Sequence, residues 1–150
     1  MFFMDKLTLF GDRLKELMFD GGLSFREMAD ISGADLTMVY RWARGDGYPR
    51  TRTLIRIADH FSCSLDYLLG LSDDSEVRVF RASPVSFGER LRGLLTRKRL
   101  TEYRAVRATG ISRSRFRDWR YDVRLPSPEN LCILASFLDV SADFLVGREG

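Results

Sequence analysis

The chain has 150 residues, a hydrophobic content of 45% and only four prolines, which is the composition of a folded protein and not of a disordered one. It contains no apolar run long enough to cross a membrane. The apolar start at residues 1–4 is interrupted by Asp5 and Lys6, so we do not expect this segment to be a secretory signal. The net charge is +3, but residues 1–75 carry 9 Lys and Arg against 12 Asp and Glu, whereas residues 76–150 carry 15 against 9. The second half is therefore the stronger candidate for binding phosphate.

Cysteine and histidine are too few to suggest a disulfide framework or a metal site. Cys63 and Cys132 have no C-x-x-C spacing, so we interpret both as small buried apolar residues. His60 is the only histidine, and we expect a structural or surface role for it. Without a signal segment the protein should stay in the cytoplasm. No Walker loop, paired-carboxylate site or nucleophile motif is present, so we expect neither an enzyme nor a cofactor.

Three helices are predicted in the first third of the chain. The second starts at Ser24, which forms a capping box with Glu27. Gly33 ends it, because only glycine enters the left-handed conformation without a steric cost. Asp35 is the expected N-cap of the third helix and Gly45 its end, which gives the order helix, tight turn, helix. The first helix should end near residues 21–22, and its apolar side chains at helical spacing are Phe10, Leu14, Leu17 and Met18.

Two further helices complete this part of the chain. On the third helix, Val39 and Trp42 lie about one turn apart and should point into the core. Ser64 is the expected cap of a short fifth helix, Leu65 to Leu69, which Gly70 stops. Between them a fourth helix follows Pro49, with one apolar face made of Leu54, Ile57, Ala58 and Phe61. The sequence thus predicts five helices over residues 10–70.

The same pattern returns 77 positions later without a gap. Residues 10–70 and 87–147 are identical at 15 of 61 positions, mostly apolar, Gly or Pro positions that shape a fold. The second copy repeats the signals of the first, with Leu91, Leu94 and Leu95 in its first helix, Thr101, Gly110 and Ser112 at the caps and the turn, Phe116 and Trp119 inward, and Ser127 with Pro128 opening its fourth helix. We therefore predict an all-α chain of two tandem five-helix domains, preceded by an N-terminal extension at residues 1–9.

Residues 71–86 are expected to link the two domains. They include Pro84, two adjacent acids, and an alternation of Val77 and Val79 that could form a short strand. Fully extended, these 16 residues would span roughly 50–55 Å. That reach could place two binding modules about 34 Å apart, which is one turn of duplex DNA.

In the joint spacing of these signals, the chain resembles the phage-repressor-like helix-turn-helix family. This family is also called the Cro and lambda-repressor-like family or the xenobiotic-response-element family. The resemblance rests on the run from Ser24 to Gly45, on Pro49, Leu54, Ile57 and Ala58, and on the run from Ser64 to Gly70, each with its counterpart in the second copy. It implies lambda-repressor-like domains whose third helix enters the major groove of double-stranded DNA, as in bacterial and phage transcriptional regulators.

The resemblance also implies which side chains meet DNA. Opposite the inward face, the third helix of the first domain carries Leu36, Thr37, Tyr40, Arg41 and Arg44. The second domain carries Arg113, Ser114, Arg117, Asp118 and Tyr121, with Arg115 and Arg120 beside them for the backbone. Arginine binds guanine through two hydrogen bonds, so the second set suits DNA well. Leu36 could touch a thymine methyl group, yet Leu36, Met38 and Tyr40 together would also make a protein-contacting patch.

Five positions depart from the family pattern. Family members usually carry Gln just inside the second helix, where it reaches a phosphate, but here Phe25 and Glu102 occupy that position. Asp35 is a carboxylate that would face phosphate unless it stays committed to capping. Val106 replaces a small residue and should crowd the contact between the second and third helices. Asp122 replaces the closing glycine, although aspartate tolerates the left-handed conformation.

Two functions of different class fit these features. The first is a sequence-specific DNA-binding transcriptional regulator, expected to be a repressor, with two fused reading heads and possible homodimerisation. The alternative is an interaction protein, built like antitoxins and antirepressors, in which the first domain dimerises or holds a partner and the second alone binds DNA. Neither a membrane nor a small-molecule ligand is expected as a partner.

Overall fold

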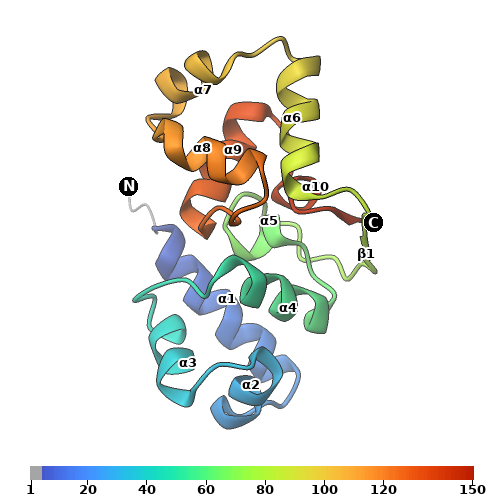
Figure 1. The fold of residues 1–150 in the computed structure, drawn as a ribbon. Helices are drawn as coiled ribbons and strands as arrows, with labels where there is room; N and C mark the ends of the chain where they lie inside the picture. Colours follow the sequence, from blue (N-terminus) through green and yellow to red (C-terminus); the bar gives the residue numbers. More distant parts are fainter. Residues whose placement is uncertain (1–4) are drawn as a thin grey trace. The chain divides into compact units, whose positions relative to one another are not determined.

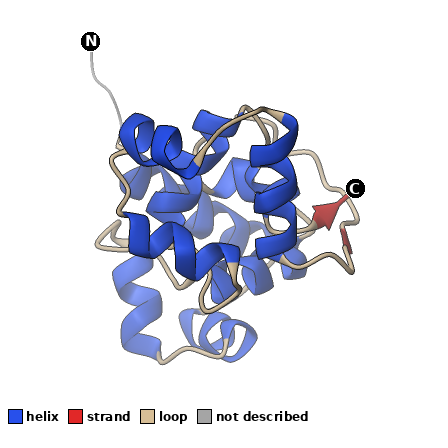
Figure 2. Ribbon diagram, turned by 45° about the horizontal axis from the view of Figure 1, so that its top comes forward, coloured by secondary structure: helices blue, strands red, loops and turns tan. Residues whose placement is uncertain are grey.

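Helices make up most of the protein in the computed structural model, which describes residues 5–150 (Figure 1, Figure 2). The chain divides into two units, of which unit 1 ends at Val79 and unit 2 comprises Phe80–Gly150. The boundary lies inside the expected linker. Within residues 5–150, none of the helices combines the length and the hydropathy of a membrane span. In the same part of the chain, no group of three or more His, Cys, Asp or Glu side chains is placed to hold a metal ion.

Unit 1 has five helices among its described residues, as the sequence predicts. Ser24 and Glu27 form the expected capping box, and Gly33 adopts the left-handed conformation with φ 74°. Asp35 stands at the N-cap of the third helix, but its side chain makes no capping hydrogen bond. The helices are α1 (Lys6–Asp20), α2 (Phe25–Ser32), α3 (Leu36–Ala43), α4 (Thr51–Phe61) and α5 (Leu65–Leu68).

The expected N-terminal extension is partly helical. Helix α1 already begins at Lys6, so residues 6–9 belong to the helix. The carboxylate of Asp5 caps it by accepting the Thr8 N–H at 2.9 Å, and this hydrogen bond holds the pKa of Asp5 below its ordinary value. Residues 1–4 of the extension lie outside the described residues. Sequence periodicity missed this first turn because Phe10 is the first residue of α1 that is fully buried.

Unit 2 has its five helices in the same order and adds two short strands. The strands pair antiparallel, with Arg81 opposite Glu149 and Ala82 opposite Arg148. The short strand that the alternation of Val77 and Val79 could form is not present, because neither residue lies in a strand. The real pairing joins segments far apart in sequence, which a local alternation cannot reveal. The elements are β1 (Arg81–Ala82), α6 (Phe87–Arg97), α7 (Glu102–Thr109), α8 (Arg113–Arg120), α9 (Pro128–Leu138), α10 (Ala142–Leu145) and β2 (Arg148–Glu149).

Each unit has its own apolar core. Trp42 of α3 and Trp119 of α8 are buried, as predicted from their spacing. Cys63 and Cys132 are also buried and form no disulfide, which agrees with their interpretation as apolar residues. His60, at the end of α4, is exposed.

The contact between the second and third helices is filled differently in the two units. Unit 1 buries Met28 on α2 and Val39 on α3, and unit 2 buries Ala105 on α7 and Phe116 on α8. The larger side chain of this contact therefore lies on the second helix in unit 1 and on the third helix in unit 2. Val106, the residue next to Ala105, is only half-buried.

A glycine in the first helix of each unit allows the end of the third helix to approach closely. A Cβ on Gly11 would lie 2.7 Å from the carbonyl oxygen of Ala43 and 2.8 Å from that of Trp42. A Cβ on Gly88 would meet the carbonyl oxygen of Arg120 at even shorter range. Cβ atoms essentially never come within 3.0 Å of a heavy atom from another part of the chain. This contact accounts for glycine at both positions.

Gly88→Ala should therefore destabilise unit 2. Overpacking a rigid contact typically costs about 1–3 kcal/mol, so we expect the free energy of unfolding to fall by that amount. Gly93→Ala in the same helix is the matched control, because a Cβ there would meet nothing within 4 Å. It should stabilise the helix by about 0.5–1 kcal/mol. Urea unfolding of the intact chain, followed by circular dichroism, measures both, and equal midpoints for the two variants would contradict the close-contact explanation.

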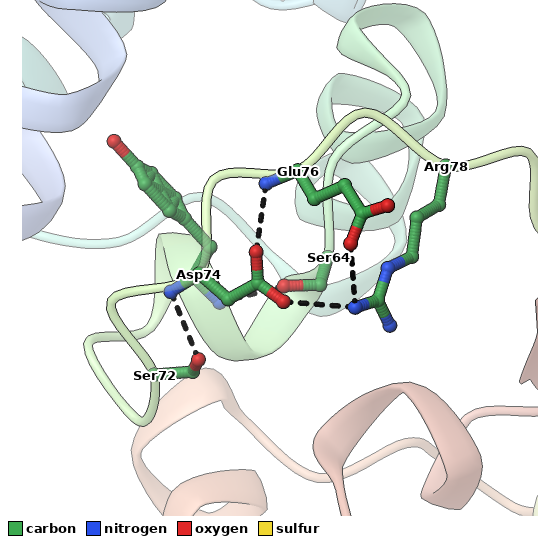
Figure 3. A network of polar contacts seen from close by, with 6 residues as sticks. Ser64, Ser72, Asp74, Glu76 and Arg78 are labelled. Atoms are coloured by element: carbon green, nitrogen blue, oxygen red, sulfur yellow. Dashed lines mark hydrogen bonds and ion pairs between the residues drawn. The ribbon is translucent and has the colours of Figure 1, made fainter.

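The start of the expected linker is bound to unit 1. Arg13 of α1 donates to the carbonyl oxygen of Ser72 at 2.8 Å and to the carboxylate of Asp73 at 2.7 Å. The backbone N–H of Arg78 donates to the carbonyl oxygen of Ser62 at 2.8 Å. The guanidinium of Arg78 also pairs with Asp74 and Glu76, at 2.8 and 3.0 Å, in a turn that Figure 3 shows from close by.

The end of the expected linker is bound to unit 2. The Ser83 N–H donates to the carbonyl oxygen of Gly147 at 2.7 Å, and the Phe80 ring lies 4.1 Å from the guanidinium carbon of Arg148. Only Val79 remains between these anchored stretches, and the step from Arg78 to Phe80 spans roughly 7 Å when extended. The free connection is thus far shorter than the sixteen residues expected.

Candidate nucleic-acid interface

Helix α3 of unit 1 keeps one side in the core and leaves the other open. Trp42 and Val39 are fully covered, and the opposite face carries the residues that helical spacing assigned to it. The short turn at Gly33 joins α2 and α3, which pack on each other (Figure 1). On the open face Leu36 is half-buried, and the exposed side chains are Thr37, Tyr40, Arg41 and Arg44.

An aromatic pair lies at the start of this helix-turn-helix. The ring of Phe25, the first residue of α2, stacks on the ring of Tyr40, with centroids 4.6 Å apart and planes inclined by 21°. Such a pair contributes about 0.5–1.5 kcal/mol beyond the area it buries. Tyr40 is 44% exposed, so the pair presents apolar surface beside α3. Sequence reasoning placed Tyr40 on this face but missed its partner, because the two residues are 15 positions apart.

The charge of the unit 1 helix-turn-helix is nearly balanced. Residues 24–47 contain three Arg against four Asp and Glu. Arg44 already pairs with Asp46 at 3.0 Å, with both side chains more than half exposed. An exposed pair of this kind is worth about 0–1 kcal/mol, so a phosphate could replace the carboxylate at little cost.

The corresponding surface of unit 2 is strongly basic. Residues 101–124 contain seven Arg against three Asp and Glu. Gly110 makes the left-handed turn with φ 72°, and Ser112 caps α8 by accepting the Arg115 N–H. Asp118 is half-buried and pairs with Arg124 at 3.2 Å. Arg120 is also half-buried, and the exposed side chains on α8 and just after it are Arg113, Ser114, Arg115, Arg117 and Tyr121.

Glu102, the first residue of α7, pairs with two arginines of α8. One carboxylate oxygen accepts Nε of Arg113 at 3.1 Å, and the other accepts Nη1 of Arg120. The side chain of Glu102 is only 18% exposed, whereas that of Arg113 is 78% exposed. Sequence reasoning identified Glu102 as a departure from the usual Gln but missed both ion pairs. The available signal was the spacing of Arg113 and Arg120, which puts them on one side of α8.

Asp122 connects the end of α8 to the start of α6. Its backbone takes the left-handed conformation, with φ 58°, as expected for a residue in place of the closing glycine. Its carboxylate accepts the Ser86 hydroxyl and the Gly88 N–H, both at 2.8 Å. Asp122 therefore helps to fix the position of α8 on the unit, a role that the sequence did not reveal.

Part of unit 1 is similar to a known protein family. Residues 13–74 match the family model of the Cro/C1-type helix-turn-helix DNA-binding domain. This range covers α2 to α5 completely and α1 from Arg13 onward. Searches of curated proteins and of solved structures give no match.

Proposed function

We propose that the chain, in which residues 13–74 match the Cro/C1-type helix-turn-helix DNA-binding domain, is a sequence-specific transcriptional regulator that acts as a repressor. It carries two helix-turn-helix heads, α3 of unit 1 and α8 of unit 2, and each head binds a major groove of double-stranded DNA. The protein acts in the cytoplasm, without catalysis and without a cofactor. The observation that carries the proposal is the repetition, in unit 2, of the helix order and open third-helix face of the matched domain.

Unit 2 supplies most of the affinity. Its helix-turn-helix has an excess of arginine, and phosphate neutralisation by such residues dominates the affinity of proteins for DNA. Arg113 and Arg117 are exposed on the first two turns of α8, where a recognition helix meets base edges. Each can bind a guanine through two hydrogen bonds. Ser114 contacts a base or phosphate, and Arg115 contacts the backbone.

Unit 1 adds a second, chemically different half-site. Thr37 and Arg41 are exposed polar groups on α3, and Leu36 can contact a thymine methyl group. The side chain of Arg44 lies at the end of the same face and can exchange Asp46 for a phosphate. Because Leu36 and Thr37 differ from Arg113 and Ser114, we expect one chain to prefer two unlike half-sites.

A second candidate function is supported by the surface of unit 1. The Phe25–Tyr40 pair and the balanced charge of residues 24–47 suit a protein partner as well as DNA. In this alternative, unit 1 dimerises or holds a partner, as antitoxins and antirepressors of similar build do, and unit 2 alone binds DNA.

Selection of bound duplexes from a random library tests the proposal. We expect the intact chain to enrich one defined site, with guanines at positions where Arg113 and Arg117 read the major groove. The enriched site also gives the half-site spacing and symmetry. Binding that persists without enrichment of any sequence would contradict a sequence-specific regulator.

A further inference from the structure

Three positions of the helix-turn-helix change together between the two units. All three are apolar in unit 1, where they are Phe25, Leu36 and Ala43, and all three are charged in unit 2, where they are Glu102, Arg113 and Arg120. In unit 2 the three side chains form one ion-pair cluster. Glu102 therefore belongs with these two arginines and is not an isolated change from the family's Gln.

The cluster holds the arginines by different parts of their side chains. Arg120 is bound through Nη1 and is 29% exposed, so it is largely committed to Glu102. Arg113 is bound through Nε and is 78% exposed. Its two Nη groups are the donors with which arginine grips O6 and N7 of guanine end-on. The ion pair thus fixes the guanidinium of Arg113 while leaving that pair of donors to a base.

We propose that Glu102 makes unit 2 selective for its own DNA sequence over other DNA, an inference that rests on the proposed binding of DNA by α8. Binding to arbitrary sequences comes from phosphate neutralisation, whereas sequence is read at base edges. The carboxylate repels phosphates, occupies Arg120, and fixes the guanidinium of Arg113 in one orientation. It therefore weakens phosphate-only complexes more than the complex in which Arg113 meets a guanine. Glu102 acts as a positioning residue through Arg113.

The test compares Glu102→Gln with Glu89→Gln in the intact chain. Both variants remove one negative charge from unit 2, and Glu89 is an exposed residue of α6, outside the helix-turn-helix. Affinities for the selected duplex and for a scrambled duplex are measured over a series of salt concentrations. We expect Glu102→Gln to raise the affinity for the scrambled duplex about tenfold. The salt dependence of this affinity should become steeper, by the equivalent of roughly one to two additional phosphate contacts. In Glu102→Gln the ratio of the affinity for the selected duplex to the affinity for the scrambled duplex should therefore fall about tenfold. In Glu89→Gln this ratio should be unchanged.

The outcomes separate this inference from the proposed function. The inference would be overturned if the ratio of affinities for the selected and the scrambled duplex were equal in wild type, Glu102→Gln and Glu89→Gln. It would also be overturned if Glu102→Gln lost affinity equally for both duplexes, which would indicate that Glu102 only supports the structure. Wild-type protein that shows no preference for any duplex would instead contradict the proposed function. In an Arg113→Ala background, Glu102→Gln should change the ratio much less, and an undiminished effect would exclude action through Arg113.

Discussion

Replacing Arg113 and Arg117 together by alanine should lower the affinity of the intact chain for its selected duplex by about 30-fold or more. Each arginine that grips a guanine contributes about 1–3 kcal/mol of discrimination, so each single variant should lose about 5- to 150-fold. Both side chains are exposed and neither is part of the buried core, so the fold should be unaffected. Fluorescence anisotropy on the selected duplex, with circular dichroism of each variant, measures this.

Arg115→Ala provides the contrast for these variants. Arg115 lies on the same helix but is proposed to contact the phosphate backbone of the DNA. Its loss should therefore weaken binding about equally for all DNA sequences and reduce the slope of the salt dependence by roughly one. Arg113→Ala and Arg117→Ala should instead relax the preference at one base pair each. If both of these variants bound DNA with unchanged affinity and kept intact circular dichroism spectra, α8 would not be the recognition helix.

The second large effect is expected from unit 1. Once unit 2 is bound, covalent linkage gives unit 1 a high effective concentration, so losing its contacts should cost the intact chain about 100-fold in affinity. Thr37→Ala combined with Arg41→Ala removes two exposed polar groups of α3 without touching its buried face. Two engaged heads also bind more phosphates than one, so the salt dependence should become shallower in this variant.

Lys15→Ala is the matched control for that experiment. Lys15 is an exposed residue of α1 whose loss removes one positive charge from unit 1 without altering α3. We expect it to change affinity less than threefold, as a single exposed charge does. If Thr37→Ala with Arg41→Ala behaves like Lys15→Ala, unit 1 does not read DNA and the interaction function is favoured.

Local sequence signals predicted the helices well because helix ends are set by a few adjacent residues. Ser24, Gly33, Ser112 and Gly110 each act on the backbone within a few positions, and the structure has them at the expected ends of helices. Trp42 was likewise placed in the core by its spacing alone. Such effects need no knowledge of the rest of the chain.

Contacts between distant segments could not be predicted in the same way. The expected linker is held by Arg13 and by the pairing of Arg81 with Glu149, and each of these contacts bridges more than 50 positions. The ion pairs of Glu102 depend on the side-chain reach of arginine across two helices. Helical spacing predicts the exposed face of α8 but not which of its charged side chains are paired with Glu102 or Arg124.

Footprinting of the intact chain on its selected duplex tests the two-headed mode of binding most directly. We expect two protected segments of unlike sequence. The double variant Arg113→Ala with Arg117→Ala should lose protection of one segment, and the double variant Thr37→Ala with Arg41→Ala should lose protection of the other. A symmetric pair of segments would indicate a homodimer. A single protected segment of about half a turn, unchanged by Thr37→Ala with Arg41→Ala, would contradict the two-headed regulator and leave unit 1 as an interaction module.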